Sequence, residues 1–141
     1  LDRCFHRVPK TVERAVHICC GYPDKLDPDE DYPKAPRESY LDLATGLQDV
    51  VIDAVSIEDA HRPNDLSLLE RFTRTKVIFG VIAIAKSEIE EVEAVRERLR
   101  QAQDHIDPHR LIAAPDCGLG LLGRDLARRK LRVLAEAAHS I

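Results

Sequence analysis

Three short stretches of the sequence carry side chains that bind metals, and the first holds an imidazole and a thiol two residues apart. His17 and Cys19 lie in the apolar run Ala-Val-His-Ile-Cys-Cys at residues 15–20. Successive side chains of an extended strand alternate between its faces, so these two point the same way. Cys20 points to the opposite face and is expected in the core, with a local twist that makes it a spare ligand as the alternative. Such a pair is half of a tetrahedral zinc site.

The second and third stretches add a carboxylate and another thiol. Glu58 ends the β-branched run at residues 50–58, and Cys117 lies in a Pro-Asp-Cys-Gly turn after the apolar run at 110–114. Carboxylates are almost never fully buried unless they are paired or bind a metal, and an ion pair with Arg62 is the alternative for Glu58. Thiolates, imidazoles and carboxylates are the usual zinc donors. The predicted Zn²⁺ ligands are therefore His17, Cys19, Glu58 and Cys117.

A site with four protein ligands has two interpretations. A closed tetrahedral site would be structural, whereas a catalytic zinc keeps one position open. The catalytic interpretation requires one weak ligand, and Glu58 is the one expected to leave when a substrate thiol arrives. His61 and Arg62 follow Glu58 directly and are candidates for substrate contact, with ordinary loop residues as the alternative. Asp116, next to Cys117, is a candidate for orienting a ligand or for stabilising its turn.

The pattern of apolar residues predicts the elements that position these side chains. Strands are expected at 15–19, 50–58, 76–84 and 110–114, and helices at 37–48, 66–71, 87–103 and 124–138. This fourfold alternation of strand and helix is typical of parallel β-α units, whose crossovers bring the carboxyl ends of all strands to one edge. The three metal-binding stretches should therefore meet at that edge of an α/β fold.

Helix faces and loops can be predicted from the same pattern. The first helix is expected to bury Tyr40, Leu41, Leu43, Ala44 and Leu47, and the last to bury Leu126, Leu131, Leu134 and Ala138. Residues 1–10 are polar and expected to be irregular, and Ser87 is expected to cap the third helix. The segment 21–36 contains four prolines and five acidic residues. Loops of this length in compact domains tend to be functional, so 21–36 is a candidate lid.

Composition limits the classes of protein that fit. The chain has 141 residues, 44% of them hydrophobic and 33% charged, which is typical of one globular domain. A net charge of -4 with scattered Lys and Arg argues against nucleic acid as a partner. No apolar run approaches the roughly 20 residues that span a bilayer, and no signal peptide opens the chain, so we expect a cytoplasmic protein without a membrane partner. Because the chain lacks Met and begins with Leu1, we expect it to be part of a longer protein.

Three motifs resemble, in order and approximate spacing, the zinc site of the cobalamin-independent methionine synthase superfamily. They are His-Ile-Cys at 17–19, Val-Ser-Ile-Glu at 55–58 and Ala-Pro-Asp-Cys-Gly-Leu at 114–119. The resemblance covers residues 15–138 and implies a TIM-type (β/α) barrel with Zn²⁺ bound at its mouth by the His, the first Cys, the Glu and the last Cys. It also implies a zinc-dependent transferase that alkylates a small thiol, most like methyl transfer from a methyl-folate to homocysteine.

The chain departs from this family at the third strand and in length. Methionine synthases carry Asp-x-His there, with the His serving in proton transfer, whereas this chain has Ala83-Ile84-Ala85 followed by Lys86. Two alternatives therefore stay open: epoxide opening with coenzyme M, whose sulfonate Lys86 and Arg62 would contact, and a non-catalytic zinc-stabilised scaffold. A full barrel takes eight β-α units. Residues 1–141 would form its C-terminal half, completed by an upstream segment, a partner chain or a second copy.

Overall fold

A four-stranded parallel sheet forms the centre of the structure, which is a computed structural model describing residues 1–21, 23–28 and 34–141. The strands are β1 (Ala15–Ile18), β2 (Ala54–Glu58), β3 (Lys76–Ile82) and β4 (Leu111–Pro115). They pair in the order β1-β2-β3-β4, each strand next to its neighbour in the chain. The predicted α/β fold with parallel strands is confirmed, and all four carboxyl ends lie at one edge.

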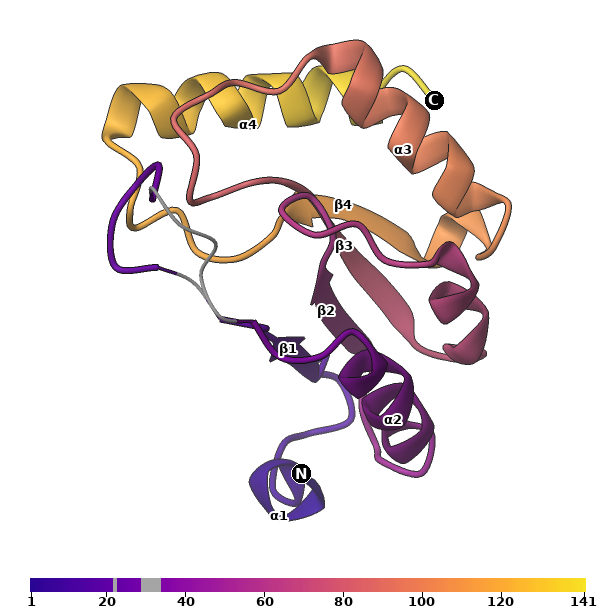
Figure 1. Ribbon diagram of the computed structural model, residues 1–141. Coiled ribbons are helices and arrows are strands. Elements are labelled where there is room, and N and C mark those ends of the chain that lie inside the picture. Colours follow the sequence, from indigo (N-terminus) through magenta and orange to yellow (C-terminus); the bar gives the residue numbers. More distant parts are fainter. Residues whose placement is uncertain (22, 29–33) are drawn as a thin grey trace.

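Helices fill the connections between the strands. They are α2 (Glu38–Leu47), the 3₁₀ helix η1 (Leu66–Arg71), α3 (Val92–Gln103), the 3₁₀ helix η2 (Pro108–Arg110) and α4 (Arg124–Ala138), and a short helix α1 (Asp2–Phe5) precedes the sheet. Figure 1 shows α3 and α4 side by side above β3 and β4, with α2 beside β1 and β2. Each of the first three strands is therefore joined to the next by a helical crossover, and α4 follows the last strand, as expected for β-α units.

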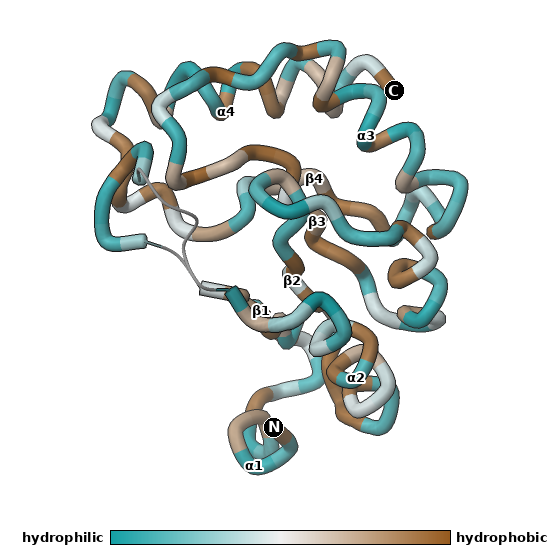
Figure 2. The backbone as a smooth tube through the Cα atoms, viewed as in Figure 1, coloured by the Kyte–Doolittle hydropathy of each residue, from teal (hydrophilic) through white to brown (hydrophobic). Residues whose placement is uncertain are grey.

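The two faces of the sheet differ in how they are covered. Val55 and Ile57 of β2 and Val77 and Phe79 of β3 are fully buried in one core with residues of α2, α3 and α4. Figure 2 shows these strands as the most apolar part of the chain. The opposite face carries one cross-strand row, His17, Ser56, Ile78 and Ile112, and Ile112 is 40% exposed. The described part of the chain thus covers one face and leaves the other partly open.

Several element boundaries differ from the sequence prediction; β3, for example, ends at Ile82 rather than at residue 84. Strand β2 begins at Ala54 rather than at residue 50. Residues 50–53 are irregular, and the Asp53 carboxylate accepts hydrogen bonds from the backbone and guanidinium of Arg14. Helix α3 begins at Val92 rather than at Ser87, whose backbone N–H donates to a loop carboxylate. Residues 2–5, expected to be irregular, form α1.

The buried helix faces are narrower than predicted. Helix α2 buries Tyr40, Ala44 and Leu47, which follow an i, i+4, i+7 spacing, whereas Leu41 and Leu43 are exposed. Helix α4 buries Lys130, Leu134 and Ala137 with the same spacing, whereas Leu131 is exposed. The lysine replaces an apolar residue on this face because its ammonium group is fully hydrogen-bonded inside the protein.

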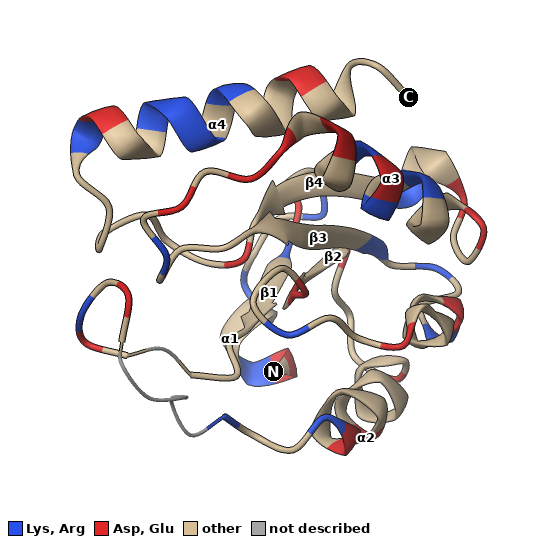
Figure 3. Cartoon of the chain, turned by 45° about the horizontal axis from the view of Figure 1, so that its top comes forward, with Lys and Arg blue, Asp and Glu red and all other residues tan. Residues whose placement is uncertain are grey.

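Charged residues lie mainly on the helices and loops. Figure 3 shows strands that are almost free of charge and an α4 that carries several basic residues on its surface. In the described part of the chain, none of the helices is both long enough and apolar enough to cross a membrane.

Candidate metal site

Four side chains with metal-binding atoms meet at the carboxyl edge of the sheet. His17 lies on β1, Cys19 follows it, Glu58 ends β2 and Cys117 follows β4. One donor atom from each lies within 4.8 Å of the donor atoms of the other three. The structure therefore brings together all four residues that the sequence predicted as zinc ligands.

Glu58 is the buried centre of this group, with 1% of its surface exposed. Its Oε2 accepts a hydrogen bond of 2.7 Å from the backbone N–H of Cys20. Its Oε1 is buried without a hydrogen-bond partner among the described residues, and His17 Nε2 is 3.9 Å away from it. An unsatisfied buried carboxylate oxygen is costly unless a cation approaches it. This orphaned oxygen and the mixed thiol, imidazole and carboxylate donors fit Zn²⁺.

The alternative ion pair between Glu58 and Arg62 is absent from the described part of the chain. The Arg62 guanidinium donates instead to the backbone carbonyl of Ala35. The imidazole of His17 is also oriented by a neighbour, because its Nδ1 lies 2.9 Å from the Ser56 hydroxyl across the strand pair. This contact leaves Nε2 facing Glu58, as a metal-binding imidazole requires.

The two adjacent thiols are held in their neutral form. Cys19 is exposed as a residue, yet desolvation of its thiol, with a contribution from Glu58, raises its pKa to about 11. Burial, again reinforced by Glu58, raises the pKa of Cys20 to about 12. Metals bind thiolates, so a cation at this edge would favour the thiolate form and oppose the effects of burial and of the Glu58 charge on the two pKa values.

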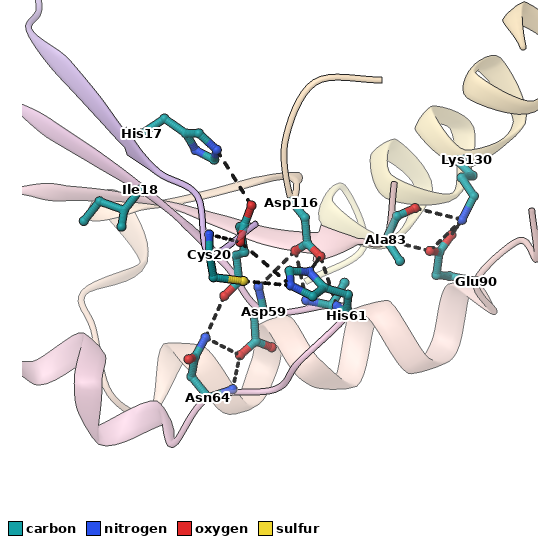
Figure 4. Close-up of polar contacts among 12 residues, drawn as sticks. His17, Ile18, Cys20, Asp59, His61, Asn64, Ala83, Glu90, Asp116 and Lys130 are labelled. Atoms are coloured by element: carbon teal, nitrogen blue, oxygen red, sulfur yellow. Dashed lines mark hydrogen bonds and ion pairs between the residues drawn. The ribbon is translucent and has the colours of Figure 1, made fainter. Parts of the chain in front are cut away.

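Asp116 lies beside the ligand group and is fully buried. Its Oδ1 accepts hydrogen bonds of 2.9 Å from the backbone N–H groups of Asp59 and Ala60, and its Oδ2 accepts one of 3.0 Å from that of His61. The same Oδ2 lies 2.5 Å from Nδ1 of the His61 ring (Figure 4). These contacts join the turn after β4 to the loop at residues 59–61, and the orientation of a ligand by Asp116 stays a prediction.

Gly80 on β3 makes room for this carboxylate. A Cβ atom at residue 80 would lie 2.4 Å from Asp116 Oδ1 and 2.7 Å from Asp116 Cα. The close approach also brings the backbone N–H of Asp116 to the carbonyl of Ile82, at the irregularity between β3 and β4. Glycine is therefore required here by space.

His61 points back toward the end of β1, a contact that the sequence did not predict. Its Nε2 is 3.0 Å from Cys20 Sγ and 3.8 Å from Glu58 Oε2 (Figure 4). Cys20 is buried as predicted. Cys20 lies beyond the end of β1, however, and its thiol contacts His61 outside the hydrophobic core cluster, which strand alternation could not predict.

Lys86 is placed apart from this group. It is exposed and lines a cavity of about 440 Å³ together with Asp59 and Arg98, and none of the four predicted ligands lines that cavity. Two of the four residues predicted to contact substrate lie at the ligand group in the described part of the chain. His61 lies 3.8 Å from Glu58, and Asp116 binds the loop at residues 59–61. The buried Asp59 in that loop is paired with Arg98 at 2.7 Å.

An ion pair occupies the end of the third strand. Lys130 Nζ donates to the carbonyl of Ala83 at 3.0 Å and to Glu90 at 2.8 Å, and Glu90 accepts from the N–H of Ala83 at 2.9 Å. Both Ala83 and Ala85 are buried. The sequence alone did not predict this pair, because a lysine on a helix is ordinarily exposed.

The segment 21–36 is attached to the loops around the site at both described ends. The N–H of Asp27 donates to the carbonyl of Ala85, its carboxylate accepts from the N–H of Ser87, and the N–H of Ala35 donates to the carbonyl of Cys20. Residues 22 and 29–33 of this candidate lid lie outside the described residues.

Comparison with known proteins gives the class to which this arrangement belongs. A family model described as "Cobalamin-independent synthase, Catalytic domain" matches residues 38–140, and the chain belongs to that family. A curated methionine synthase from Thermococcus kodakarensis is 35% identical over 94 residues, which are 66% of this chain and 28% of the relative. One from Saccharolobus islandicus is 31% identical over 128 residues, which are 89% of this chain and 33% of the relative.

Solved structures agree with this assignment. A B12-independent methionine synthase from Shewanella sp. W3-18-1, in complex with selenomethionine, is 30% identical and superposes with a TM-score of 0.84 over 99% of this chain and 41% of its own. A Listeria monocytogenes structure, at 17% identity and a TM-score of 0.64, shares the fold. The chain spans about a third of the length of the curated relatives it matches.

Proposed function

We propose that this chain is the zinc-binding part of a transferase that alkylates a small thiol, most like methyl transfer from a methyl-folate to homocysteine. The observation that carries the proposal is the meeting of four donors around the orphaned oxygen of Glu58. Family membership and the names of the relatives support it. Zinc held by His17, Cys19, Glu58 and Cys117 would lower the pKa of a bound thiol toward neutrality.

The residues of the chain then have distinct tasks. Ser56 fixes the His17 ring, and the Pro-Asp-Cys-Gly turn, held through Asp116, fixes Cys117. Glu58 would be the ligand that leaves when a substrate thiol arrives, because its Oε2 would keep the hydrogen bond from the Cys20 N–H. His61 and Asp116 hold the loops at the carboxyl edge of the sheet in place. Arg62 and Lys86 would bind an anionic group of the substrate.

The remainder of the pocket would come from outside these residues. The partly open sheet face, with Ile112 40% exposed, fits the inner wall of a (β/α) barrel of which residues 1–141 form the C-terminal half. An upstream segment, a partner chain or a second copy would cover that face and supply contacts to the alkyl donor. The segment 21–36 would close over the thiol.

The end of β3 favours two further possibilities. Ala83 and Ala85 offer no side-chain proton donor, and Lys130 and Glu90 hold this strand end instead. One alternative is the opening of an epoxide by coenzyme M, in which the thiol would attack an epoxide instead of a methyl donor. A non-catalytic zinc-stabilised scaffold is the other.

Zinc content and thiol binding test the proposal. Purified protein should bind zinc, Cys117→Ser should lose the ion held by the four predicted ligands, and Cys4→Ser should retain it, because Cys4 is an exposed residue of α1 outside that group. Wild-type zinc content in Cys117→Ser would overturn the site.

X-ray absorption at the zinc edge then separates the functions. A sulfur ligand gained with homocysteine supports methionine synthesis, one gained with coenzyme M supports epoxide opening, and no change with either thiol supports the scaffold.

A further inference from the structure

We propose a second metal position, formed by Cys20 Sγ, His61 Nε2 and Glu58 Oε2, beside the first and sharing the Glu58 carboxylate with it. These three donor atoms lie within 4.8 Å of one another. The position uses the oxygen of Glu58 that faces away from His17. The inference goes beyond the proposed function, which requires one ion.

The donor separations are close to those of a metal site. His61 Nε2 lies 3.0 Å from Cys20 Sγ and 3.8 Å from Glu58 Oε2. Tetrahedral zinc, with bonds of about 2.0–2.3 Å, places its donors roughly 3.3–3.7 Å apart. A change of about half an ångström in each separation would therefore accommodate the ion.

His61 is held in the way that metal-binding histidines are held. Asp116 Oδ2 lies 2.5 Å from Nδ1 and fixes the proton there, so the lone pair of Nε2 points toward Cys20 and Glu58. The carboxylate itself is anchored by three backbone N–H groups, so the ring has little freedom. Without a metal, the same Nε2 would accept a hydrogen bond from the Cys20 thiol.

Burial and charge also favour a second cation. Cys20 is 8% exposed, Glu58 1%, and the His61 side chain 6%. The thiolates of Cys19, Cys20 and Cys117 and the carboxylate of Glu58 would together carry about four negative charges. A second divalent ion would compensate the Cys20 thiolate, which stays a neutral thiol without it.

A metal titration of the full chain tests the second position. Metal-free protein titrated with Zn²⁺ and analysed by mass spectrometry should bind about two ions, and Cys20→Ser and His61→Gln should each bind about one. Cys117→Ser should also bind about one, and Cys4→Ser about two. With Co²⁺ as the probe, Cys20→Ser should lose about a third of the thiolate charge-transfer absorption, because one thiolate of three is removed.

Each contrary result has its own meaning. A wild-type chain that binds one ion, lost in Cys117→Ser and kept in Cys20→Ser, overturns the second position and leaves the proposed function intact. One ion that is lost in Cys20→Ser and kept in Cys117→Ser supports the position and overturns the proposed function. Two ions in wild type and in both Cys20→Ser and His61→Gln overturn the position. Circular dichroism identifies a variant that fails to fold. In that case the number of ions bound by the wild-type chain still tests the second position.

Discussion

Two buried carboxylates at the same edge of the sheet have opposite surroundings. Asp116, after β4, accepts hydrogen bonds from three backbone N–H groups and contacts the His61 ring. Glu58, at the end of β2, has one oxygen bonded to Cys20 and one without a partner among the described residues. A buried acid with filled hydrogen bonds stabilises its loop, whereas one with an orphaned oxygen marks the place for a cation.

The largest expected effect comes from removing the satisfied carboxylate. In metal-free protein, Asp116→Ala removes the carboxylate acceptor of the Asp59 and His61 N–H groups, whereas the Ala60 N–H keeps the carbonyl of Gly80. The substitution should lower the free energy of unfolding by about 3–5 kcal/mol. Urea denaturation measures this. Asp42→Ala, at an exposed position of α2, is the control and should change it by less than about 0.5 kcal/mol. A loss below about 1 kcal/mol for Asp116→Ala would contradict the comparison.

Crowding the same carboxylate from β3 should have a smaller effect. Gly80→Ala places a methyl group against Asp116 and should lower the free energy of unfolding by about 1–3 kcal/mol. Gly46→Ala, in α2 with nothing within 4 Å of the added atom, should raise it by up to about 1 kcal/mol. Equal effects of the two substitutions in urea denaturation would show that the space around Asp116 is not limiting.

Glu58 should behave in the opposite way to Asp116. In metal-free protein, Glu58→Gln keeps an acceptor for the Cys20 N–H and removes a buried charge, so the free energy of unfolding should stay within about 1 kcal/mol of wild type. Zinc should stabilise the wild type and have a weaker effect on this variant. A decrease of more than about 2 kcal/mol in the free energy of unfolding without metal would show that Glu58, like Asp116, stabilises the fold.

The stability of metal-free protein should also depend on pH. The native pKa values of Cys19 and Cys20 are raised to about 11 and about 12, from the usual 9.0. Above pH 9 the unfolded chain therefore binds fewer protons than the native one, so stability falls as pH rises toward 12. Cys20→Ala should flatten this fall, and Cys4→Ala should not. Denaturation midpoints between pH 8 and pH 11, a range set by these shifts, measure it.

Much of the arrangement follows from sequence because parallel β-α units have a fixed geometry. The alternation of strands and helices was enough to predict that His17, Glu58 and Cys117 would meet, since carboxyl ends share one edge. Boundaries were less predictable where a local polar contact replaced the apolar pattern. The pairing of Asp53 with Arg14 shortened β2, and a loop contact of Ser87 delayed α3.

Contacts between loops were the least predictable part of the site. Alternation along β1 indicated that Cys20 would be buried, but the approach of His61 depends on how Asp116 gathers the loop after β2. The burial of Lys130 likewise depends on Glu90, a residue far away in sequence. Such pairs are fixed by three-dimensional packing, for which hydrophobic periodicity contains no signal.

The sequential strand order has a consequence for how the site is assembled during folding. Each strand pairs with its neighbour in the chain, so β1, β2 and β3 can associate before β4 exists. A nascent chain that stops before β4 holds His17, Cys19 and Glu58 but lacks Cys117 and the carboxylate that orients His61. Tight binding of the proposed zinc would therefore come last, after the final β-α unit has docked. Zinc binding would then indicate that the fold is complete.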